Sequence, residues 1–536
     1  MASFTPHDDF EPFERRDREL ERAARSIIAQ CRNDRFGRGW RPKGVDEVAI
    51  LLEALGFSAD IVHELWYPDL FALARDVTTL IDKYISDEER AEERDLSWFR
   101  LACRDYAIGS LYSGPWVIAV IGLAAFGASL WSSLSTPLHL ATAIALGVYL
   151  AQIVSGFYAQ AIARRLTFYF LQENAPLMRW TFERFTLLAL ATTLAVAGAL
   201  WLVLRPGYGD PDAWLAASFC AGSAIFQLSL APLYTLRRFA WIIGIAAGAT
   251  LATGLTFVLF FHRHVDLPWE PATLALEIGA IGLLVLAVTH RSLAASARRS
   301  HGELVAPSAR SIVKATLPYA AFGALYFAAI LCDRLFAGFA VGHGAYAYAS
   351  AYELGADIAL LAILPITGVA NVILEALPRR ILEGATARVN EIGAFERGML
   401  RFYLIGLGAL ALAILAAIAL GIVGGTWLVR SEHLGGGDPS ALAVLQTATV
   451  GYAIVMVGLL NAQILFFLSR PTPLLIAAGA ALATTIVWCG WALARGFGSV
   501  AMADGLVAAA IVFALLTTIS TARAMRDFTY AYYAAY

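Results

Sequence analysis

Four ionisable side chains interrupt two strongly apolar stretches in the second half of the sequence. Asp333 and Arg334 break one apolar run, and Glu353 and Asp357 stand four residues apart in the next. Charges inside a membrane are costly, so they mark function by default. Two carboxylates on one helix face repel each other, and a proton, a cation or Arg334 would relieve that repulsion. The pattern predicts a polar substrate path or a proton or cation site, with a structural lock between helices as the alternative.

Other polar residues lie alone in apolar surroundings. Glu277 is one of them, and both a functional role and structural pairing stay open for it. Six carboxamide side chains are expected to form hydrogen bonds between helices, namely Gln152, Gln160, Gln227, Asn371, Asn461 and Gln463. Because the five cysteines are scattered and form no C-x-x-C pair, we expect neither a metal site nor a disulfide. No phosphate-binding loop or nucleophile motif is present, so we expect no enzyme and no cofactor.

The composition sets the frame for these residues. Of the 536 residues, 59% are hydrophobic and 15% are charged, whereas soluble domains carry about 25% charged residues. This excludes a disordered chain, a nucleic-acid binder and a simple cytosolic enzyme, and it indicates an all-α polytopic membrane protein. Residues 1–105 hold roughly 16 of the 40 basic and 23 of the 42 acidic side chains. The chain therefore divides into a charged segment and an apolar body.

The charged segment, residues 1–105, carries short runs with helical spacing of apolar residues, such as Leu20 with Ala24 and Ile27, or Leu73 with Val77. The spacing predicts a small helical cytoplasmic bundle. Two roles fit it: a solvated cap without chemistry, or a docking surface for a cytoplasmic partner.

The remainder contains twelve segments long and apolar enough to cross a bilayer. The eighth and ninth are too long for straight spans, so they extend beyond the membrane or break at Pro365 and at Gly424–Gly425. The segments are 110–134, 137–163, 181–204, 212–234, 238–261, 269–290, 312–341, 345–378, 398–429, 440–469, 472–495 and 498–521.

The loops between these segments differ in charge. Alternate loops carry about 17 Lys and Arg residues against about 4 in the others, which sets the orientation by the positive-inside rule. Both termini are therefore expected in the cytoplasm. The first segment opens YAIGSLYSGPW (106–116) and the seventh YAAFGALYFAA (319–329), while the second ends QAIARRL and the eighth EALPRRI. This predicts a parallel repeat of two six-helix membrane bundles, residues 106–300 and 301–536.

The first segment also contains the run Ser113, Gly114, Pro115 and Trp116. A bend or close helix contact explains it, as does a simple helix start. This run resembles the membrane component of Pel-type exopolysaccharide export, the PelG-like proteins of the multidrug/oligosaccharidyl-lipid/polysaccharide flippase superfamily. Leu325–Tyr326 followed by Asp333–Arg334, and then YASAYE (348–353), match further motifs of that family. The likeness covers residues 105–525 or so, and the long segment before it departs from the family.

The resemblance implies export of a polysaccharide across the bacterial inner membrane, with a cytoplasmic glycosyltransferase and other inner-membrane proteins of the synthase complex as partners beside membrane lipid, and no nucleic acid. The substrate path would run between the two bundles. Its expected residues are Asp333, Arg334, Glu353, Asp357, Tyr326, Tyr348, Tyr352 and Glu277. A lipid-linked oligosaccharide flippase, a small-molecule antiporter and a non-transporting scaffold of a synthase complex remain alternatives.

Overall fold

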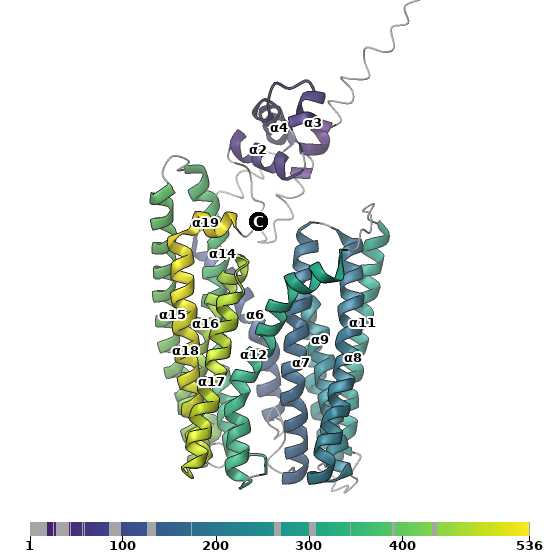
Figure 1. Ribbon diagram of the computed structural model, residues 1–536, viewed down its shortest axis with the longest axis vertical. Helices are drawn as coiled ribbons and strands as arrows, with labels where there is room; N and C mark the ends of the chain where they lie inside the picture. Colours follow the sequence, from purple (N-terminus) through teal and green to yellow (C-terminus); the bar gives the residue numbers. More distant parts are fainter. Residues whose placement is uncertain are drawn as a thin grey trace, which may run out of the picture. The chain divides into compact units, whose positions relative to one another are not determined.

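The computed structural model describes a chain of helices joined by short connections (Figure 1). It covers residues 19–24, 26–27, 42, 44–55, 57, 59–84, 98–125, 136–172, 174–261, 270–299, 307–343, 345–387, 392–430 and 437–534. Within these ranges no strand occurs.

A small helical unit lies at the beginning of the described chain. It contains α2 (Val45–Ala54), α3 (Ala59–Glu64) and α4 (Leu70–Tyr84). Leu20, Ala24 and Ile27 are buried in one hydrophobic core with Leu73 and Val77. These are positions that the helical spacing predicts as apolar faces, and their burial supplies most of the stability that short helices lack on their own.

Eleven of the described helices are long and apolar enough to cross a membrane. They correspond to the second to twelfth predicted segments, so the chain is a multi-pass membrane protein. The first predicted segment begins in α6 (Trp98–Ala125), and its residues 126–134 lie outside the described ranges. The others are α7 (Leu138–Leu171), α8 (Ala175–Tyr208), α9 (Asp210–Thr235), α10 (Phe239–Phe261), α11 (Glu270–Arg299), α12 (Ala309–Val341), α13 (Ser350–Ala359) with α14 (Ile363–Ala387), α15 (Ile392–Val429), α16 (Pro439–Phe467), α17 (Thr472–Ala494) and α18 (Met502–Arg526).

The eighth segment breaks and the ninth does not. A single 3-10 turn, Leu360–Ala362, separates α13 from α14 just before Pro365. Proline lacks an N–H and its ring crowds the preceding turn, so the break falls where the sequence predicts it. By contrast, α15 continues as one helix through Gly424 and Gly425, so the break predicted there is wrong. Its 38 residues instead make α15 longer than the apolar core of a bilayer requires.

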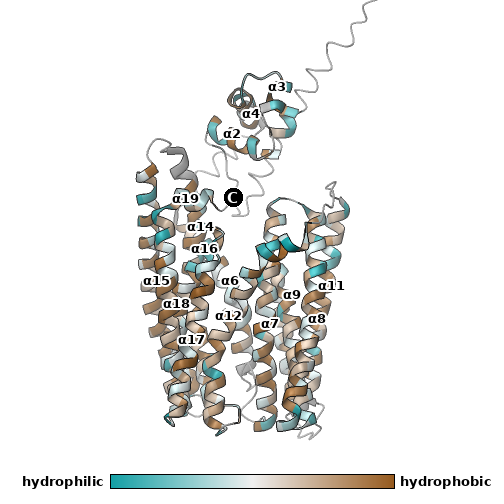
Figure 2. Cartoon of the chain, viewed as in Figure 1, coloured by the Kyte–Doolittle hydropathy of each residue, from teal (hydrophilic) through white to brown (hydrophobic). Residues whose placement is uncertain are grey.

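The membrane helices form two bundles, one from α6 to α11 and one from α12 to α18 (Figure 1). Figure 2 shows apolar residues along most of the helix length and polar residues near the ends. The bundles diverge toward the end that carries α19 (Phe528–Tyr533) and converge toward the connection between α12 and α13 (Figure 1). Helix α12 starts beside α7 and ends among the helices of the second bundle.

Two close helix crossings relate the bundles. At one, a Cβ added to Gly323 of α12 would lie 2.8 Å from the carbonyl carbon of Gly156 in α7. At the other, a Cβ added to Gly109 of α6 would lie 2.8 Å from the carbonyl oxygen of Thr367 in α14 and closer still to Asn371. Small residues permit such approaches of two backbones.

The predicted repeat relates these two crossings. Aligning Gly109 with Gly323, and QAIARRL with EALPRRI, pairs Asn371 with Gly156. The two crossings are therefore equivalent in the repeat: Gly323 of the second half packs against Gly156 of the first, and Gly109 of the first half packs against Asn371 of the second.

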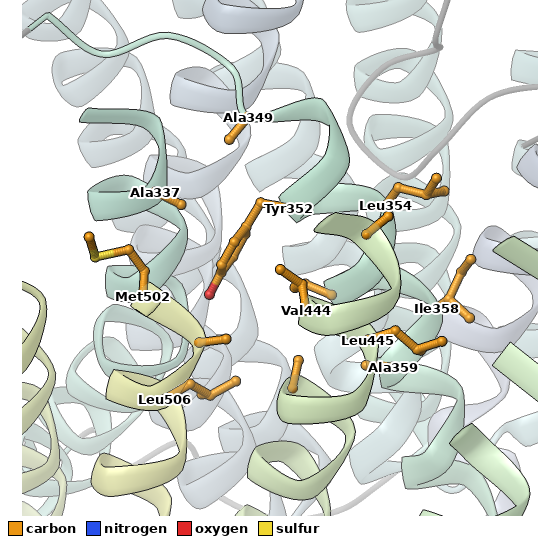
Figure 3. Close-up of a cluster of buried hydrophobic side chains, with 14 of the residues drawn as sticks. Ala337, Ala349, Tyr352, Leu354, Ile358, Ala359, Val444, Leu445, Met502 and Leu506 are labelled. Carbon is orange, nitrogen blue, oxygen red and sulfur yellow. The ribbon is translucent and has the colours of Figure 1, made fainter. Parts of the chain in front are cut away.

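The second bundle has a dense apolar core, shown in Figure 3. Tyr352 lies within it, 1% exposed, among Ala337, Val444, Met502 and Leu506. This core fixes the positions of α12, α13, α16 and α18 and therefore of the polar side chains that these helices carry.

Candidate functional site

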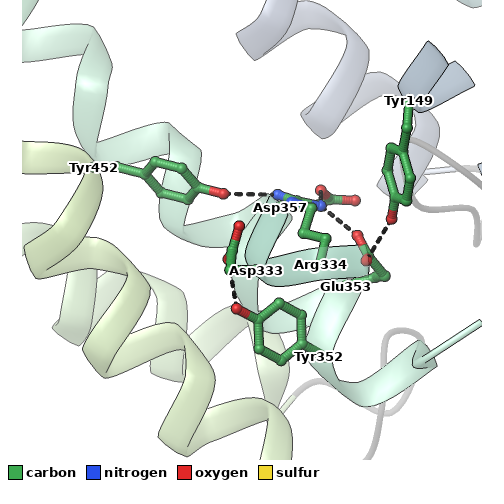
Figure 4. Close-up of polar contacts among 7 residues, drawn as sticks. All are labelled: Tyr149, Asp333, Arg334, Tyr352, Glu353, Asp357 and Tyr452. Atoms are coloured by element: carbon green, nitrogen blue, oxygen red, sulfur yellow. Dashed lines mark hydrogen bonds and ion pairs between the residues drawn. The ribbon is translucent and has the colours of Figure 1, made fainter. Parts of the chain in front are cut away.

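The four predicted ionisable residues meet in one buried network (Figure 4). The Arg334 guanidinium donates hydrogen bonds to the carboxylates of Glu353 and Asp357, the latter at 2.8 Å, and to the Tyr452 hydroxyl at 3.0 Å. Asp333 points elsewhere and accepts a hydrogen bond of 2.5 Å from the Tyr352 hydroxyl. Of the three predicted ways to relieve the repulsion between Glu353 and Asp357, the structure shows Arg334 in contact with both.

The charged groups of this network are buried, so an imbalance of charge among them is costly. Asp333, Arg334, Glu353 and Asp357 are each at most 2% exposed. The network contains one guanidinium and three carboxylates, so full ionisation leaves an excess of two negative charges in an apolar region. Such an excess is costly in a low dielectric. Binding a proton or a metal cation would bring the network closer to neutrality, and this is the chemistry that it can perform.

The network also joins the two bundles. The hydroxyl of Tyr149, on α7 of the first bundle, donates a 2.5 Å hydrogen bond to Glu353 on α13 of the second. Two more hydrogen bonds connect the bundles nearby, from the Tyr348 backbone N–H to Thr142 and from the Tyr208 hydroxyl to the carbonyl oxygen of Tyr346. All three lie at the converging end, so opening this end requires breaking them.

A cavity of about 280 Å³, the inter-bundle cavity, borders the network. Helices α6 and α7 of the first bundle and α12, α14 and α16 of the second line it. Arg334, Tyr452 and Tyr326 are among its lining residues. One face of the charge network is therefore accessible from a space between the bundles.

A second cavity of about 370 Å³, the first-bundle cavity, lies among α6 to α11. Its wall is mostly apolar, and its polar lining residues include Gln152, Ser155, Ser223 and Gln227. Trp116, Gln152 and Phe327 line both cavities, so they stand where the two spaces meet. Both volumes fall near or within the range of about 300–1,000 Å³ typical of ligand sites.

The run from Ser113 to Trp116 lies well inside α6 (Trp98–Ala125), so the helix-start explanation is wrong. The Ser113 hydroxyl donates a 3.0 Å hydrogen bond to Thr367 of α14. A Cβ at Gly114 would collide with Ile243 of α10, so this glycine permits a close helix contact. Pro115 and Trp116 line the first-bundle cavity.

Two predicted path residues lie apart from the network. Glu277 is half-buried in α11, its Oε2 atom has no hydrogen-bond partner among the described residues, and it is not one of the lining residues of either cavity. Tyr348 is buried and joins the bundles through its backbone rather than through the network. Tyr352 belongs to the network and Tyr326 to the cavity wall.

The predicted interhelical hydrogen bonds are confirmed for two residues and wrong for a third. Asn461 pairs with Tyr403 of α15 and Thr518 of α18, and Gln227 accepts from Ser155 at 2.5 Å. Gln152, in contrast, is 3% exposed, and its Oε1 atom has no partner among the described residues. It lines both cavities, and no donor among the described residues reaches its Oε1 atom.

Sequence reasoning missed Tyr149 and Tyr452. Each is one tyrosine among many aromatic residues in an apolar helix, and no spacing links either of them to Arg334. The available signal is chemical: a buried tyrosine hydroxyl needs a hydrogen-bond partner, and the charged residues of α12 and α13 offer one.

Comparison with known proteins finds similarity in structure only. No protein family and no curated protein matches the sequence. A MOP superfamily transporter from Pyrococcus furiosus is similar in structure, with 15% identity and a TM-score of 0.52, over 79% of this chain and 94% of the other. An outward-facing multidrug resistance MATE family transporter of the MOP superfamily has 16% identity and a TM-score of 0.52, over 79% and 97%. A MATE protein in its straight conformation has 15% identity and a TM-score of 0.52, over 80% and 96%.

The chain therefore has the two-bundle fold of MATE-like transporters. This agrees with the fold that the resemblance to the flippase superfamily implies. At these identities the comparison establishes the fold, and the substrate has to be argued from the site.

Proposed function

We propose that this chain moves a polysaccharide across the bacterial inner membrane, along a path between its two bundles. The observation that carries the proposal is the buried charge network that borders the inter-bundle cavity and ties the bundles together through Tyr149 and Glu353. A site of this kind can change its contacts when the bundles move, as alternating access requires.

The chemistry of the network suits a hydroxyl-rich substrate. Carboxylates, a guanidinium and the tyrosines Tyr149, Tyr352 and Tyr452 can exchange hydrogen bonds with sugar hydroxyls as the bundles separate. The chain carries no phosphate-binding loop. We therefore attribute the drive to polymer synthesis by a cytoplasmic glycosyltransferase, or to a proton or cation gradient acting on the carboxylates. One charge moved through the membrane potential is worth about 2.3 kcal/mol per 100 mV.

In the proposed orientation the arginine-rich loops and both termini are cytoplasmic. The end at which the bundles diverge then faces the cytoplasm, and the end joined by the network faces outward. Arg164 and Arg165 lie in the last turns of α7 near the diverging end, where Arg164 donates a 3.0 Å hydrogen bond to Ser469 after α16. A growing polymer would enter from the side where it is made.

A lipid-linked oligosaccharide flippase is the second candidate. The mostly apolar wall of the first-bundle cavity favours it, because that space could take an apolar part of a lipid-linked substrate. The two candidates differ in their dependence on a glycosyltransferase: an exporter of nascent polymer stops when the glycosyltransferase is removed, and a flippase still translocates a preformed lipid-linked glycan.

The test measures polysaccharide outside and inside cells that lack this gene. We expect loss of extracellular polymer with intact glycosyltransferase activity inside, and restoration by the wild-type gene but not by the Glu353→Gln, Asp357→Asn variant. Asp504→Asn, which changes an exposed carboxylate of α18, is the matched control and should restore secretion. Because the double change deprives Arg334 of its counter-charges, the amount of protein in the membrane is measured in parallel. Normal secretion without the gene would refute the proposal.

A further inference from the structure

Gln152 stands out among the buried polar residues because its environment leaves it unsatisfied. Its side chain is 3% exposed, and its Oε1 atom lacks a hydrogen-bond partner among the described residues. A buried carbonyl oxygen without a hydrogen-bond partner costs free energy comparable to a lost hydrogen bond, so such an atom in a native protein calls for an explanation. The two cavities that Gln152 lines supply one, because a ligand in them can provide the missing partner.

Gln152 is accompanied by an aromatic platform and further polar groups. Trp116 of α6 lines the same two cavities. On the side of the first-bundle cavity, Ser155 and Gln227 form a hydrogen-bonded pair, and Ser223 lies on the same wall. A carboxamide offers a donor and an acceptor together, which matches a hydroxyl group that does the same.

This combination has a definite chemical complement. A sugar ring carries hydroxyls at its rim and C–H groups on its faces, and an indole ring packs against such a face while a carboxamide bonds the rim. Among the described residues, the lining of the first-bundle cavity includes no Asp, Glu, Lys or Arg. The one such residue that lines the inter-bundle cavity is Arg334, whose charge is already paired with Glu353 and Asp357. A charged sugar placed there would lose its hydration without a counter-charge, so the site favours a neutral one.

We propose that Gln152 and Trp116 form a binding subsite for a neutral sugar unit at the junction of the two cavities. This inference rests on the proposed function, a carrier of glycans, and adds where a sugar unit binds, which residues bind it and which sugars are excluded. It also reassigns Gln152 from a contact between helices to a contact with substrate.

The test is ligand-observed saturation-transfer NMR on the full chain in lipid nanodiscs. The probes are the neutral trisaccharides cellotriose and chitotriose and the acidic trisaccharide trigalacturonate. We expect at least one neutral probe to bind and trigalacturonate not to bind. Gln152→Met, which keeps the side-chain length and removes the carboxamide, should weaken binding by about tenfold or more. Trp116→Leu should weaken it similarly.

Matched controls come from the same residue types outside the cavities. Gln463 and Trp214 are exposed on α16 and α9, so Gln463→Met and Trp214→Leu should bind the neutral probe as the wild type does. Thermal unfolding separates a binding role from a structural one. If Gln152 held helices together, Gln152→Met would lower the stability of the protein. Because its Oε1 atom has no partner among the described residues, we instead expect Gln152→Met to be as stable as the wild type or more stable.

Three outcomes overturn the inference: no binding of either neutral probe, equal binding by Gln152→Met and the wild type, or lower stability of Gln152→Met with its affinity unchanged. Should Gln152→Met fail to accumulate, Gln152→Leu takes its place in the same assay. Secretion from cells tests the proposed function separately, so a carrier without this subsite would still secrete polymer while failing the binding assay.

Discussion

At the residue scale, Arg334 decides whether the network is stable. It bridges Glu353 and Asp357, and both carboxylates are buried. Removing one partner of a buried ion pair typically costs about 3–5 kcal/mol, because it leaves uncompensated charge. We expect Arg334→Met to lower the free energy of unfolding by that order, measured by thermal unfolding of the purified protein in detergent.

The companion variant combines Arg334→Met with Glu353→Gln and Asp357→Asn. Replacing the guanidinium and its two carboxylate partners by neutral groups removes their desolvation cost together with their attraction, so most of the stability should return. Polymer secretion should stay lost, because the substrate path then lacks three of its four charged groups. A triple variant that is stable and secretes normally would reduce the network to a structural lock.

Tyr149 tests the link between the bundles. Its hydrogen bond to Glu353 connects α7 with α13, and bonds to charged groups contribute about 1.5–3 kcal/mol. In Tyr149→Phe we expect the converging end to open more often. Spin labels at Leu202 of α8 and Trp427 of α15, both exposed near that end, should show an added population at longer distance.

Tyr158→Phe is the control for this measurement. Tyr158 bonds Thr192 at 2.7 Å, and both residues belong to the first bundle. Its loss also removes a hydrogen bond of a tyrosine hydroxyl, but one between neutral groups within one bundle, and it leaves the contact between the bundles untouched. An unchanged distance distribution in Tyr149→Phe would contradict the assignment of this bond as a latch.

The residues also show how far a sequence predicts a site. The meeting of Arg334 with Glu353 and Asp357 follows from the cost of charge in a membrane and from helix order, and the structure confirms it. The phenol groups that complete the network come from α7 and α16, far away in sequence. Their selection from the chain's 20 tyrosines depends on how the helices pack, which hydropathy and periodicity do not encode.

At the element scale, alanine substitutions at the two glycine crossings, Gly323 and Gly109, should lower stability to a similar degree. Gly323→Ala would press a Cβ against the backbone of Gly156, and Gly109→Ala would press one against α14. Backbone cannot move aside as a flexible side chain can, so each change should lower the free energy of unfolding by about 1–3 kcal/mol. Thermal unfolding in detergent measures both.

Gly198→Ala provides the comparison, because a Cβ there has no neighbour within 4 Å. In a helix, alanine is favoured over glycine by about 0.5–1 kcal/mol, so this variant should be as stable as the wild type or more stable. Equal unfolding temperatures for all three variants would contradict the close backbone contacts at Gly323 and Gly109.

The elements themselves were predictable to different degrees. Segment length and hydropathy place the second to twelfth membrane helices, because the bilayer imposes both. Pro365 marks the break before α14 because its chemistry is local. The break predicted at Gly424 and Gly425 is wrong, because α15 continues through both and Gly425 instead permits a close approach to Leu445 and Ile358, a tertiary contact that the sequence does not reveal.

At the scale of the whole molecule, deletion of the charged segment before α6 would distinguish a carrier from a scaffold. Its helices α2 to α4 have their own hydrophobic core. The deletion should end before Trp98, where α6 begins. Asp105 in the first turns of α6 is 1% exposed and forms a 2.6 Å ion pair with Arg379 of α14, so this part of α6 has to stay. Removing residues 1–97 therefore takes away one core and leaves this ion pair in place.

The two roles predict different results for this deletion. If the chain is a carrier, the membrane bundles keep their network and cavities after the deletion. The shortened protein should then still bind the neutral trisaccharide, and it should lose only the coupling of secretion to the glycosyltransferase. Extracellular polymer should fall while cytoplasmic polymer persists, and overproduction of the glycosyltransferase should restore part of the secretion. If the chain is a scaffold, deletion should abolish polymer synthesis as well, because the complex no longer assembles. Loss of cytoplasmic polymer in the deletion strain, with the shortened protein present in the membrane at its normal level, would contradict the carrier.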